Sequence, residues 1–254
     1  MRRELPAHGI RSFRGLASEA IELTRDRIDV WLIQTRIASA IANDLSQLLS
    51  PEETTRAARF RFEHLRCAFI ATRAALRFLL GLYLQIEPAL VQICYGKHGK
   101  PYLAIAESIA FNVSHSGDLA ALAFGVGGDI GVDVECLRPV PEISALVRRF
   151  LSCTEVDHLL SLPREEQQSF FFRYWTCKES FVKAVGTGLS TPLDSFDVIL
   201  YSDQLPGVVE LAPNEGWTIV ELDLPNGFAG SLAYRGKGKH LRIFPLASWS
   251  GSLG

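Results

Sequence analysis

The sequence predicts an α+β fold, in which amphipathic helices and short strands share the chain. Apolar residues recur at three- and four-residue spacing between Ser50 and Leu80 and again between Phe170 and Val185, as on one face of a helix. Short runs rich in Val, Ile and aromatic residues, bounded by Gly and Pro, are typical of strands. A hydrophobic content of 48% with 21% charged residues fits a globular chain with its own core.

The overall charge and the cysteines exclude several classes of protein. Lys and Arg number 26 against 28 Asp and Glu, so the chain lacks the basic surplus of a general nucleic-acid-binding protein. The five cysteines are widely spaced without a C-x-x-C pair, which argues against a zinc site and fits a reducing cytoplasm. No apolar run approaches the roughly 18 residues of a membrane span. We therefore expect a cytoplasmic protein without membrane or nucleic-acid partners.

The first elements are expected after a loose N-terminal extension, residues 1–27. The run Ile28-Asp-Val-Trp-Leu-Ile33 predicts a strand, and Ser50-Pro51-Glu52-Glu53 is typical of a helix start. From there we expect a helical stretch that runs to Leu80 and is closed by Gly81. The next expected strands are at residues 91–95 and 111–113.

The middle of the chain predicts a β-hairpin followed by helices. Leu119–Phe124 and Ile130–Glu135 lie on either side of the turn sequence Gly125-Val-Gly-Gly128. Helices are expected after Pro141, and Gly186 ends the last of them. The further expected elements are helices at 144–150, from 154 and at 170–185, and strands at 196–200, 217–222, 228–234 and 241–244.

A faint internal repeat links the two helical stretches. Thr72–Gly81 and Cys177–Gly186 share a cation, an apolar pair and a final glycine at the same offsets. Any two amphipathic helices that end in glycine could share these features, so the repeat by itself leaves a duplication open.

Two acids share one face of the predicted strand Ile130–Glu135. Because side chains alternate across a strand, Asp133 and Glu135 lie on the face of Gly131, opposite the apolar residues. Two like charges at this spacing repel each other unless a cation lies between them, and hard oxygen ligands suit Mg²⁺. The alternative is a solvated edge strand with two exposed acids.

A second set of side chains falls on one stripe of the last helix. Trp175, Glu179 and Lys183 are each one helical turn apart, so a carboxylate and an ammonium can reach the same ligand. The alternative is a surface Glu–Lys ion pair that contributes little to the stability of the fold.

Two loop segments offer groups that bind anions. Phe111–Asp118 combines side-chain donors with backbone amides, and Tyr95–Pro101 combines two lysines with glycines that admit a ligand to the backbone. The alternatives are a structural histidine at a strand end and a basic β-turn. The candidates are Asn112, Ser114 and His115 in the first segment, and Lys97, Gly99, Lys100 and Pro101 in the second.

Taken in order, four motifs resemble the 4′-phosphopantetheinyl transferase superfamily, most closely its long, single-chain, surfactin-synthetase-activating type. They are Gly-Lys-His-Gly-Lys-Pro, Phe-Asn-Val-Ser-His-Ser-Gly, Ile-Gly-Val-Asp-Val-Glu and Trp-Thr-Cys-Lys-Glu-Ser-Phe-Val-Lys, within a resemblance that covers residues 28–235. The resemblance implies two similar α/β-type halves related by a pseudo-twofold axis, with coenzyme A in the cleft between them. We therefore expect subdomains at 28–125 and 126–245, and a frayed tail at 246–254.

The resemblance also implies a reaction. The 4′-phosphopantetheine arm of coenzyme A would pass to a serine of an apo acyl or peptidyl carrier protein, with release of 3′,5′-ADP, as in a holo-acyl-carrier-protein synthase. The enzyme would act as a monomer and depend on Mg²⁺. Its metal ligands would be Asp133, Glu135 and Glu179.

Further site residues follow from the same resemblance. Lys183 would contact the diphosphate, Arg56 the 3′-phosphate end, and Glu155 matches an acid near the metal. The residues implied for the nucleotide and diphosphate are Asn112, Ser114 and His115, with Lys97, Gly99, Lys100 and Pro101 in the nearby loop.

The base that accepts the serine proton stays open among Glu179, Glu155 and a metal-bound water. Two competing interpretations also stay open. One is a Mg²⁺-dependent phosphohydrolase or nucleotidyl transferase built on the same acids and basic loops. The other is a module that binds carrier proteins without catalysis.

Overall fold

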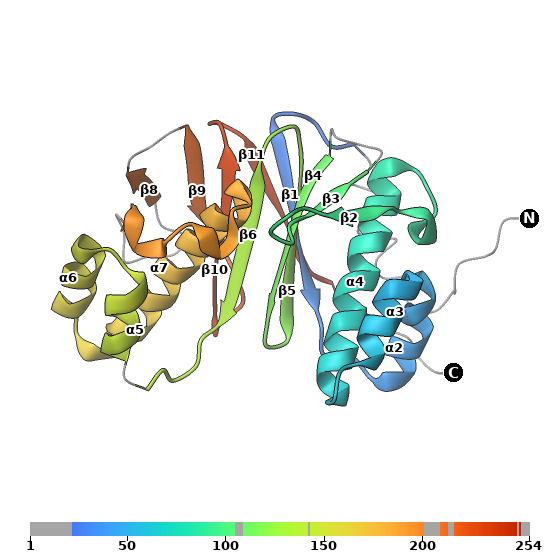
Figure 1. The fold of residues 1–254 in the computed structure, drawn as a ribbon, viewed down its shortest axis with the longest axis horizontal. Helices are drawn as coiled ribbons and strands as arrows, with labels where there is room; N and C mark the ends of the chain where they lie inside the picture. Colours follow the sequence, from blue (N-terminus) through green and yellow to red (C-terminus); the bar gives the residue numbers. More distant parts are fainter. Residues whose placement is uncertain are drawn as a thin grey trace, which may run out of the picture.

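In the computed structural model of this protein, two β-sheets lie at the centre and the helices cover their outer sides (Figure 1). The structure describes residues 22–104, 109–141, 143–200, 209–212, 216–247 and 249. Helices α2–α4 lie on one side of the strands and helices α5–α7 on the other. The predicted α+β class is confirmed.

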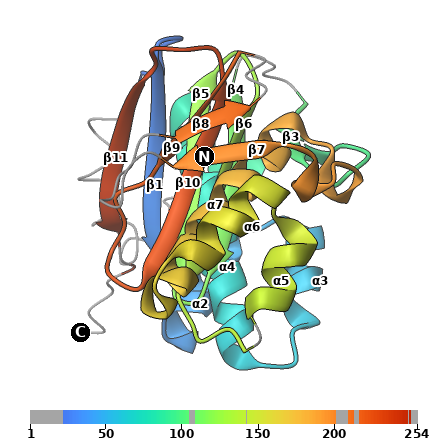
Figure 2. The ribbon, with the colours of Figure 1, turned by 90° about the vertical axis from the view of Figure 1, so that its left-hand side faces the viewer.

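The first sheet has four strands in the order β11-β1-β5-β4. These are β1 (Arg27–Gln34), β4 (Ile109–Ser116), β5 (Leu119–Val126) and β11 (His240–Ala247). Strand β1 pairs antiparallel with β5 and parallel with β11, and Figure 2 shows β11 beside β1. The C-terminal strand thus returns to the first sheet, so the expected subdomain 126–245 is wrong at its end.

The expected frayed tail, residues 246–254, also needs a correction in part. Strand β11 continues to Ala247, and Trp249 is buried in the core of the first sheet and its helices. The rest of that tail, and residues 1–21 of the expected N-terminal extension, lie outside the described residues.

Three helices cover the outer face of the first sheet: α2 (Ser39–Leu45), α3 (Pro51–Ala58) and α4 (Glu63–Leu84). Helix α3 begins as predicted, because the Ser50 side chain accepts the Glu53 N–H while the Glu53 side chain accepts the Ser50 N–H. Helix α2 was not predicted.

The expected end of the long helix at Gly81 is wrong. The helical stretch is interrupted between α3 and α4, and α4 continues through Gly81 to Leu84. The next residue, Gln85, caps the helix in the left-handed conformation at φ 56°. A Cβ on Gly81 would lie 2.8 Å from the backbone oxygen of Ile86. This glycine therefore permits a close approach of the following chain and does not cap the helix.

Helix α4 is long and apolar enough to cross a membrane, judged by length and composition, although no membrane span was expected from the sequence. The fold buries 67% of its most apolar window. Leu76, Leu79 and Leu80 are fully buried in the same core as Trp31 of β1. This placement is that of a core helix.

The second sheet has the order β6-β10-β9. Its strands are β6 (Ile130–Cys136), β9 (Trp217–Glu221) and β10 (Phe228–Arg235), and its helices are α5 (Ile143–Phe150), α6 (Cys153–Ser161) and α7 (Arg164–Val185). Two small sheets pair β2 (Ile93–Tyr95) with β3 (Pro101–Leu103) and β7 (Asp197–Leu200) with β8 (Val209–Ala212). Short 3₁₀ helices span Ser46–Leu48, Pro88–Leu90, Gly188–Ser190 and Leu193–Ser195.

The predicted hairpin of β5 and β6 is wrong. Strand β5 instead forms a hairpin with β4, in which Ser116 pairs with Leu119 across Gly117 at φ 56°. Because β1 and β4 occupy both edges of β5, no edge is left for β6. The chain turns through Gly127 and Gly128, both at positive φ, and β6 begins the second sheet.

The two halves of the molecule repeat one topology. The order β1-β5-β4 of the first half matches β6-β10-β9 of the second, with antiparallel pairing throughout. Each half also contains a 22-residue helix, α4 or α7, that ends on a left-handed residue. Apolar faces of the two sheets meet in a shared core, which includes Ile28, Val30, Leu32, Ile130, Val132 and Val134.

Candidate active site

Helix α7 packs directly against the strand that carries the two acids. Strand β6 alternates as predicted, with Val132 in the core between the sheets and Gly131 facing α7. A Cβ on Gly131 would lie 2.1 Å from the backbone oxygen of Ser180 and 2.4 Å from the Ala184 nitrogen. Glycine at this position therefore allows the contact that brings α7 onto the face of Asp133.

Asp133 is held between the helix and the neighbouring strand β4. Its Oδ1 accepts from the Lys183 ammonium at 2.6 Å and from the Ser114 hydroxyl at 2.8 Å, and Lys183 Nζ also lies 3.0 Å from Ser114 Oγ. The other oxygen, Oδ2, is buried and has no hydrogen-bond partner among the described residues. A buried carboxylate oxygen without a partner is costly, so this oxygen is suited to an added cationic ligand.

Glu135 and Glu179 complete the acidic group. Ser116 donates to Glu135 Oε2 at 2.7 Å. Burial raises the pKa of the half-buried Glu179 above its ordinary value, and the neighbouring Asp133 carboxylate raises this pKa further. The Lys183 ammonium lowers it and the Glu135 carboxylate raises it. The structure thus brings the three predicted acids and the predicted lysine into one electrostatic group.

The side chains of this acidic group do not have the geometry of a complete metal site. In the described part of the chain, no set of three His, Cys, Asp or Glu side chains has the arrangement of metal ligands. The donors nevertheless fit a hard divalent ion, because all three are carboxylates and one of them has an unpartnered buried oxygen.

A pocket of about 190 Å³, here called the polar pocket because Lys100, Asn112 and Lys183 line it, adjoins this group between the two halves. Its lining includes Gly99, Lys100, Pro101 and Asn112 from the first half and Lys183 from α7. The structure therefore brings both predicted loop segments to the lysine of the last helix. Lys97 is exposed in the same turn.

Lys100 closes the pocket against the end of α7. Its Nζ donates to the backbone oxygen of Ala184 at 2.5 Å. Burial lowers the pKa of Lys100, and Asp129 opposes this shift. Asn112 is also engaged, because its Oδ1 accepts from the Val132 N–H at 2.9 Å.

His115 lies in a positive environment to which Lys183 and Arg56 contribute. Desolvation by the surrounding protein lowers the pKa of His115, and the charges of Lys183 and then Arg56 lower it further. The guanidinium of Arg56, on α3, lies 5.2 Å from the ring centroid of Phe69. The predicted anion-binding residues therefore converge from three separate elements.

Glu155 belongs to a different environment. It closes the capping box of α6 with Ser152, and its Oε1 accepts from the Val198 N–H at 2.7 Å. The ammonium of the fully buried Lys178 lies 2.9 Å from the same oxygen. Both carboxylate oxygens thus have structural partners, so the structure groups Glu155 with Lys178 and not with the three acids.

Comparisons with known proteins agree with this arrangement. Residues 129–233 match the model of the 4′-phosphopantetheinyl transferase superfamily, and residues 39–126 match that of the 4′-phosphopantetheinyl transferase N-terminal domain. The 4′-phosphopantetheinyl transferase HetI of Nostoc is 38% identical over 221 residues, which cover 86% of this chain and 92% of that protein. The chain belongs to the 4′-phosphopantetheinyl transferase family.

A second relative and a solved structure are also similar to this chain. The 4′-phosphopantetheinyl transferase Sfp of Bacillus subtilis is 33% identical over 155 residues, which cover 61% of this chain and 68% of that protein. Among solved structures, the holo-[acyl-carrier-protein] synthase of Thermotoga maritima is similar over 43% of this chain and 63% of its own, at 24% identity and a TM-score of 0.34.

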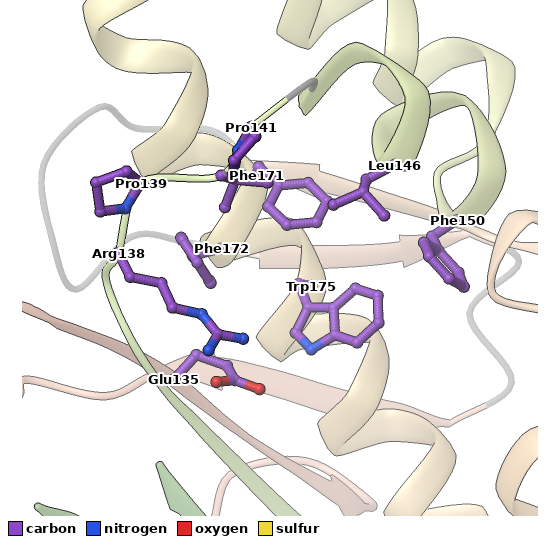
Figure 3. A pocket seen from close by; sticks show the side chains of 10 residues that line it. Glu135, Arg138, Pro139, Pro141, Leu146, Phe150, Phe171, Phe172 and Trp175 are labelled. Carbon is purple, nitrogen blue, oxygen red and sulfur yellow. The ribbon is translucent and has the colours of Figure 1, made fainter. Parts of the chain in front are cut away.

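An apolar pocket beside Glu135 was not predicted for this member of the transferase family. It has a volume of about 430 Å³, and Figure 3 shows Glu135 at one side with the rings of Phe171 and Trp175 beyond it. The aromatic run before Trp175 was a signal for it, but a run of this kind is equally expected in a core. The remaining lining residues are Arg138, Pro139, Val140, Pro141, Leu146, Phe150 and Phe172.

The serine side chains that donate to Asp133 and Glu135 were also not predicted in this role. Ser116 was predicted only as part of the anion-binding segment Phe111–Asp118, and Ser114 only for the nucleotide and diphosphate. The available signal was the alternation of Asn112, Ser114 and Ser116, which places three polar side chains on one face of β4. Which strand that face meets depends on the packing of the two halves.

Proposed function

We propose that the chain transfers the 4′-phosphopantetheine arm of coenzyme A to a serine of an apo carrier protein, with release of 3′,5′-ADP and dependence on Mg²⁺. The observation that carries this proposal is that two pockets adjoin one acidic group, one lined by two lysines and the other mainly by aromatic, proline and aliphatic side chains. Lys183 lines the polar pocket, Glu135 lines the apolar pocket, and Asp133 on β6 is bonded to Lys183.

The two pockets correspond to the two ends of coenzyme A. Its nucleotide carries three phosphates, which suit the polar pocket with Lys100, Lys183 and the nearby charge of Arg56. Its pantetheine arm is an uncharged chain of methylene and amide groups, which suits a pocket lined mainly by aromatic and proline side chains. The diphosphate that joins the two ends would then lie at the carboxylates.

Negatively charged phosphates cannot lie beside three carboxylates without a cation between them. Asp133, Glu135 and Glu179 would hold Mg²⁺, with the unpartnered Oδ2 of Asp133 as one donor. When bound, the ion supplies positive charge that stabilises a diphosphate and its leaving group. Lys183 adds a second positive charge from the side of the polar pocket.

The reaction is a phosphoryl transfer in which positioning and electrostatics dominate. The serine oxygen of the carrier protein forms a bond to the phosphorus that bears pantetheine, and the bond from that phosphorus to the oxygen of 3′,5′-ADP breaks. The hydroxyl proton passes to a base. Of the two acids predicted for that role, Glu179 lies in the site and Glu155 lies in the ion pair with Lys178.

The test is the intact mass of an apo carrier protein after incubation with the enzyme, coenzyme A and Mg²⁺. We expect a gain of one phosphopantetheine group with wild-type enzyme, and none with excess chelator or with Asp133→Asn. Asp157→Asn, an exposed aspartate on α6, is the matched control and should behave as wild type.

Other outcomes favour the competing functions. Hydrolysis products of coenzyme A without a gain in carrier mass would indicate a phosphohydrolase. Binding of the carrier protein without any turnover would indicate a non-catalytic module. Undiminished transfer by Asp133→Asn would contradict the metal assignment while leaving the transferase function in place.

A further inference from the structure

Polar side chains, and not backbone pairing, join the two halves beside the acidic group. Strands β4 and β6 belong to different sheets, yet three side chains of β4 accept backbone N–H groups of β6. Asn112 accepts from Val132 at 2.9 Å, Ser114 from Val134 at 3.3 Å, and Ser116 from Cys136 at 3.1 Å. The period of two along both strands makes these contacts a regular series.

These contacts between β4 and β6 also determine the acceptor to which each serine hydroxyl donates its proton. A hydroxyl that accepts an amide N–H keeps its one proton for a different acceptor. Ser114 directs this proton to Asp133 Oδ1 at 2.8 Å, and Ser116 directs it to Glu135 Oε2 at 2.7 Å. Each serine therefore ties an acid of the second half to a strand of the first half.

The two acids differ in how much they depend on their serine. Asp133 has a short side chain and a second partner, the Lys183 ammonium at 2.6 Å. Glu135 has a longer side chain near the end of β6, and Ser116 is its one hydrogen-bond partner in the described part of the chain. Without Ser116, the Glu135 carboxylate would have several rotamers available to it, and ordering one of them costs conformational entropy.

We propose that Ser116 is a positioning residue that orients the Glu135 carboxylate toward the cation site. A residue of the first half, Ser116, would thereby orient a metal ligand of the second half, Glu135. This inference rests on the proposed function, because it takes Glu135 as a metal ligand. Loss of a group that orients a metal ligand lowers metal affinity by roughly 10- to 100-fold in other proteins.

The test measures metal binding and not turnover. Mn²⁺, a paramagnetic substitute for Mg²⁺, is titrated into the full chain without coenzyme A, and free Mn²⁺ is followed by electron paramagnetic resonance. We compare Ser116→Thr with Ser116→Val, which have the same shape and differ only in the hydroxyl. Ser116→Thr should bind within about twofold of wild type, and Ser116→Val should lose roughly 10-fold or more.

Asn112→Ala is the control for the series itself. Asn112 accepts an amide of β6 but holds no carboxylate, since Gly131 occupies the corresponding position. Its replacement should lower the melting temperature and leave the Mn²⁺ affinity of the folded protein unchanged. A loss of metal affinity equal to that of Ser116→Val would mean that any break in the series disturbs the site, which would overturn the specific role of Ser116.

The remaining outcomes separate the two proposals. If wild type binds Mn²⁺ and Ser116→Val binds it equally well, the positioning role is wrong and the metal site stands. Equal losses in Ser116→Thr and Ser116→Val would show that the hydroxyl is not the cause, which also overturns the role. If wild type binds no Mn²⁺, the metal assignment itself fails.

Discussion

The two halves of this transferase share a skeleton and differ in what their equivalent positions carry. Strands β1 and β6 align as Ile28-Asp-Val-Trp-Leu-Ile33 with Ile130-Gly-Val-Asp-Val-Glu135, and both place the alternate apolar residues in the core between the sheets. Helices α4 and α7 align at their left-handed ends, Gln85 and Gly186. In these alignments the acids and the lysine, Asp133, Glu135, Glu179 and Lys183, correspond to Trp31, Ile33, Phe78 and Leu82.

The difference shows how one skeleton can form either a core or a site. In the first half, Trp31 is fully buried and stacks on Phe244 at a centroid distance of 3.7 Å. The same face of the second half carries carboxylates, which cannot form a dry core without cationic partners. The second half therefore depends on Lys183, on β4 and on an added cation where the first half depends on packing.

One polar feature is common to both halves. Glu53 closes the cap of α3 and pairs with Arg77 of α4 at 2.5 Å, and Glu155 closes the cap of α6 and pairs with Lys178 of α7 at 2.9 Å. Arg77 and Lys178 correspond when the long helices are aligned at their ends. Because the first half carries this pair without any acids of the site, the comparison assigns the pair a structural role.

The largest expected contrast is between Glu179→Gln and Phe78→Ala, at equivalent positions of the two long helices. Glu179→Gln should lower kcat by roughly 100-fold or more with little change in stability, because a charged group at the site is lost and its shape is kept. Phe78→Ala should cost about 3 to 5 kcal/mol of stability. Both variants are compared with wild type by their rates of transfer to a carrier protein and by unfolding in denaturant. For Phe78→Ala, the transfer rate per folded molecule should stay near that of wild type.

The second contrast tests the shared ion pair. Glu53→Gln and Glu155→Gln should each destabilise the protein by about 3 to 5 kcal/mol, because each leaves a buried cation unpaired. Turnover per folded molecule should stay near that of wild type in both variants, as measured by transfer assays on the folded fraction. If Glu155→Gln instead abolished turnover at unchanged stability, Glu155 would be the catalytic base and the equivalence of the two pairs would fail.

The smallest contrast concerns the ends of the long helices. Gly186→Ala should cost about 1 to 2 kcal/mol, because Gly186 has φ 79° and left-handed backbone disfavours a Cβ. Gln85→Gly should gain about 0.5 to 1 kcal/mol, since Gln85 already adopts φ 56°. Unfolding midpoints in denaturant measure both shifts, and shifts of the same sign would contradict the equivalence of the two helix ends.

Interactions between near neighbours could be predicted from the sequence by itself. The helix start at Ser50 was predicted correctly, because the two hydrogen bonds that cap it each span only three residues. The alternation that places Asp133 opposite Val132 was also correct, because a strand has a period of two wherever it lies. The spacing of Glu179 and Lys183 followed from the helical period in the same way.

Only the tertiary structure decided which distant segments meet. The pairing of β6 with β10, the return of β11 to β1 and the contact of Gly81 with the chain after α4 all depend on surfaces far apart in sequence or on the exact path of a turn. The partners of Glu155 and Glu135 belong to the same class, because Lys178 and Ser116 are neither strand nor helix neighbours of these acids. Local propensity and periodicity specify what each element is and which face it presents, whereas the partner of that face is specified by packing of the whole chain.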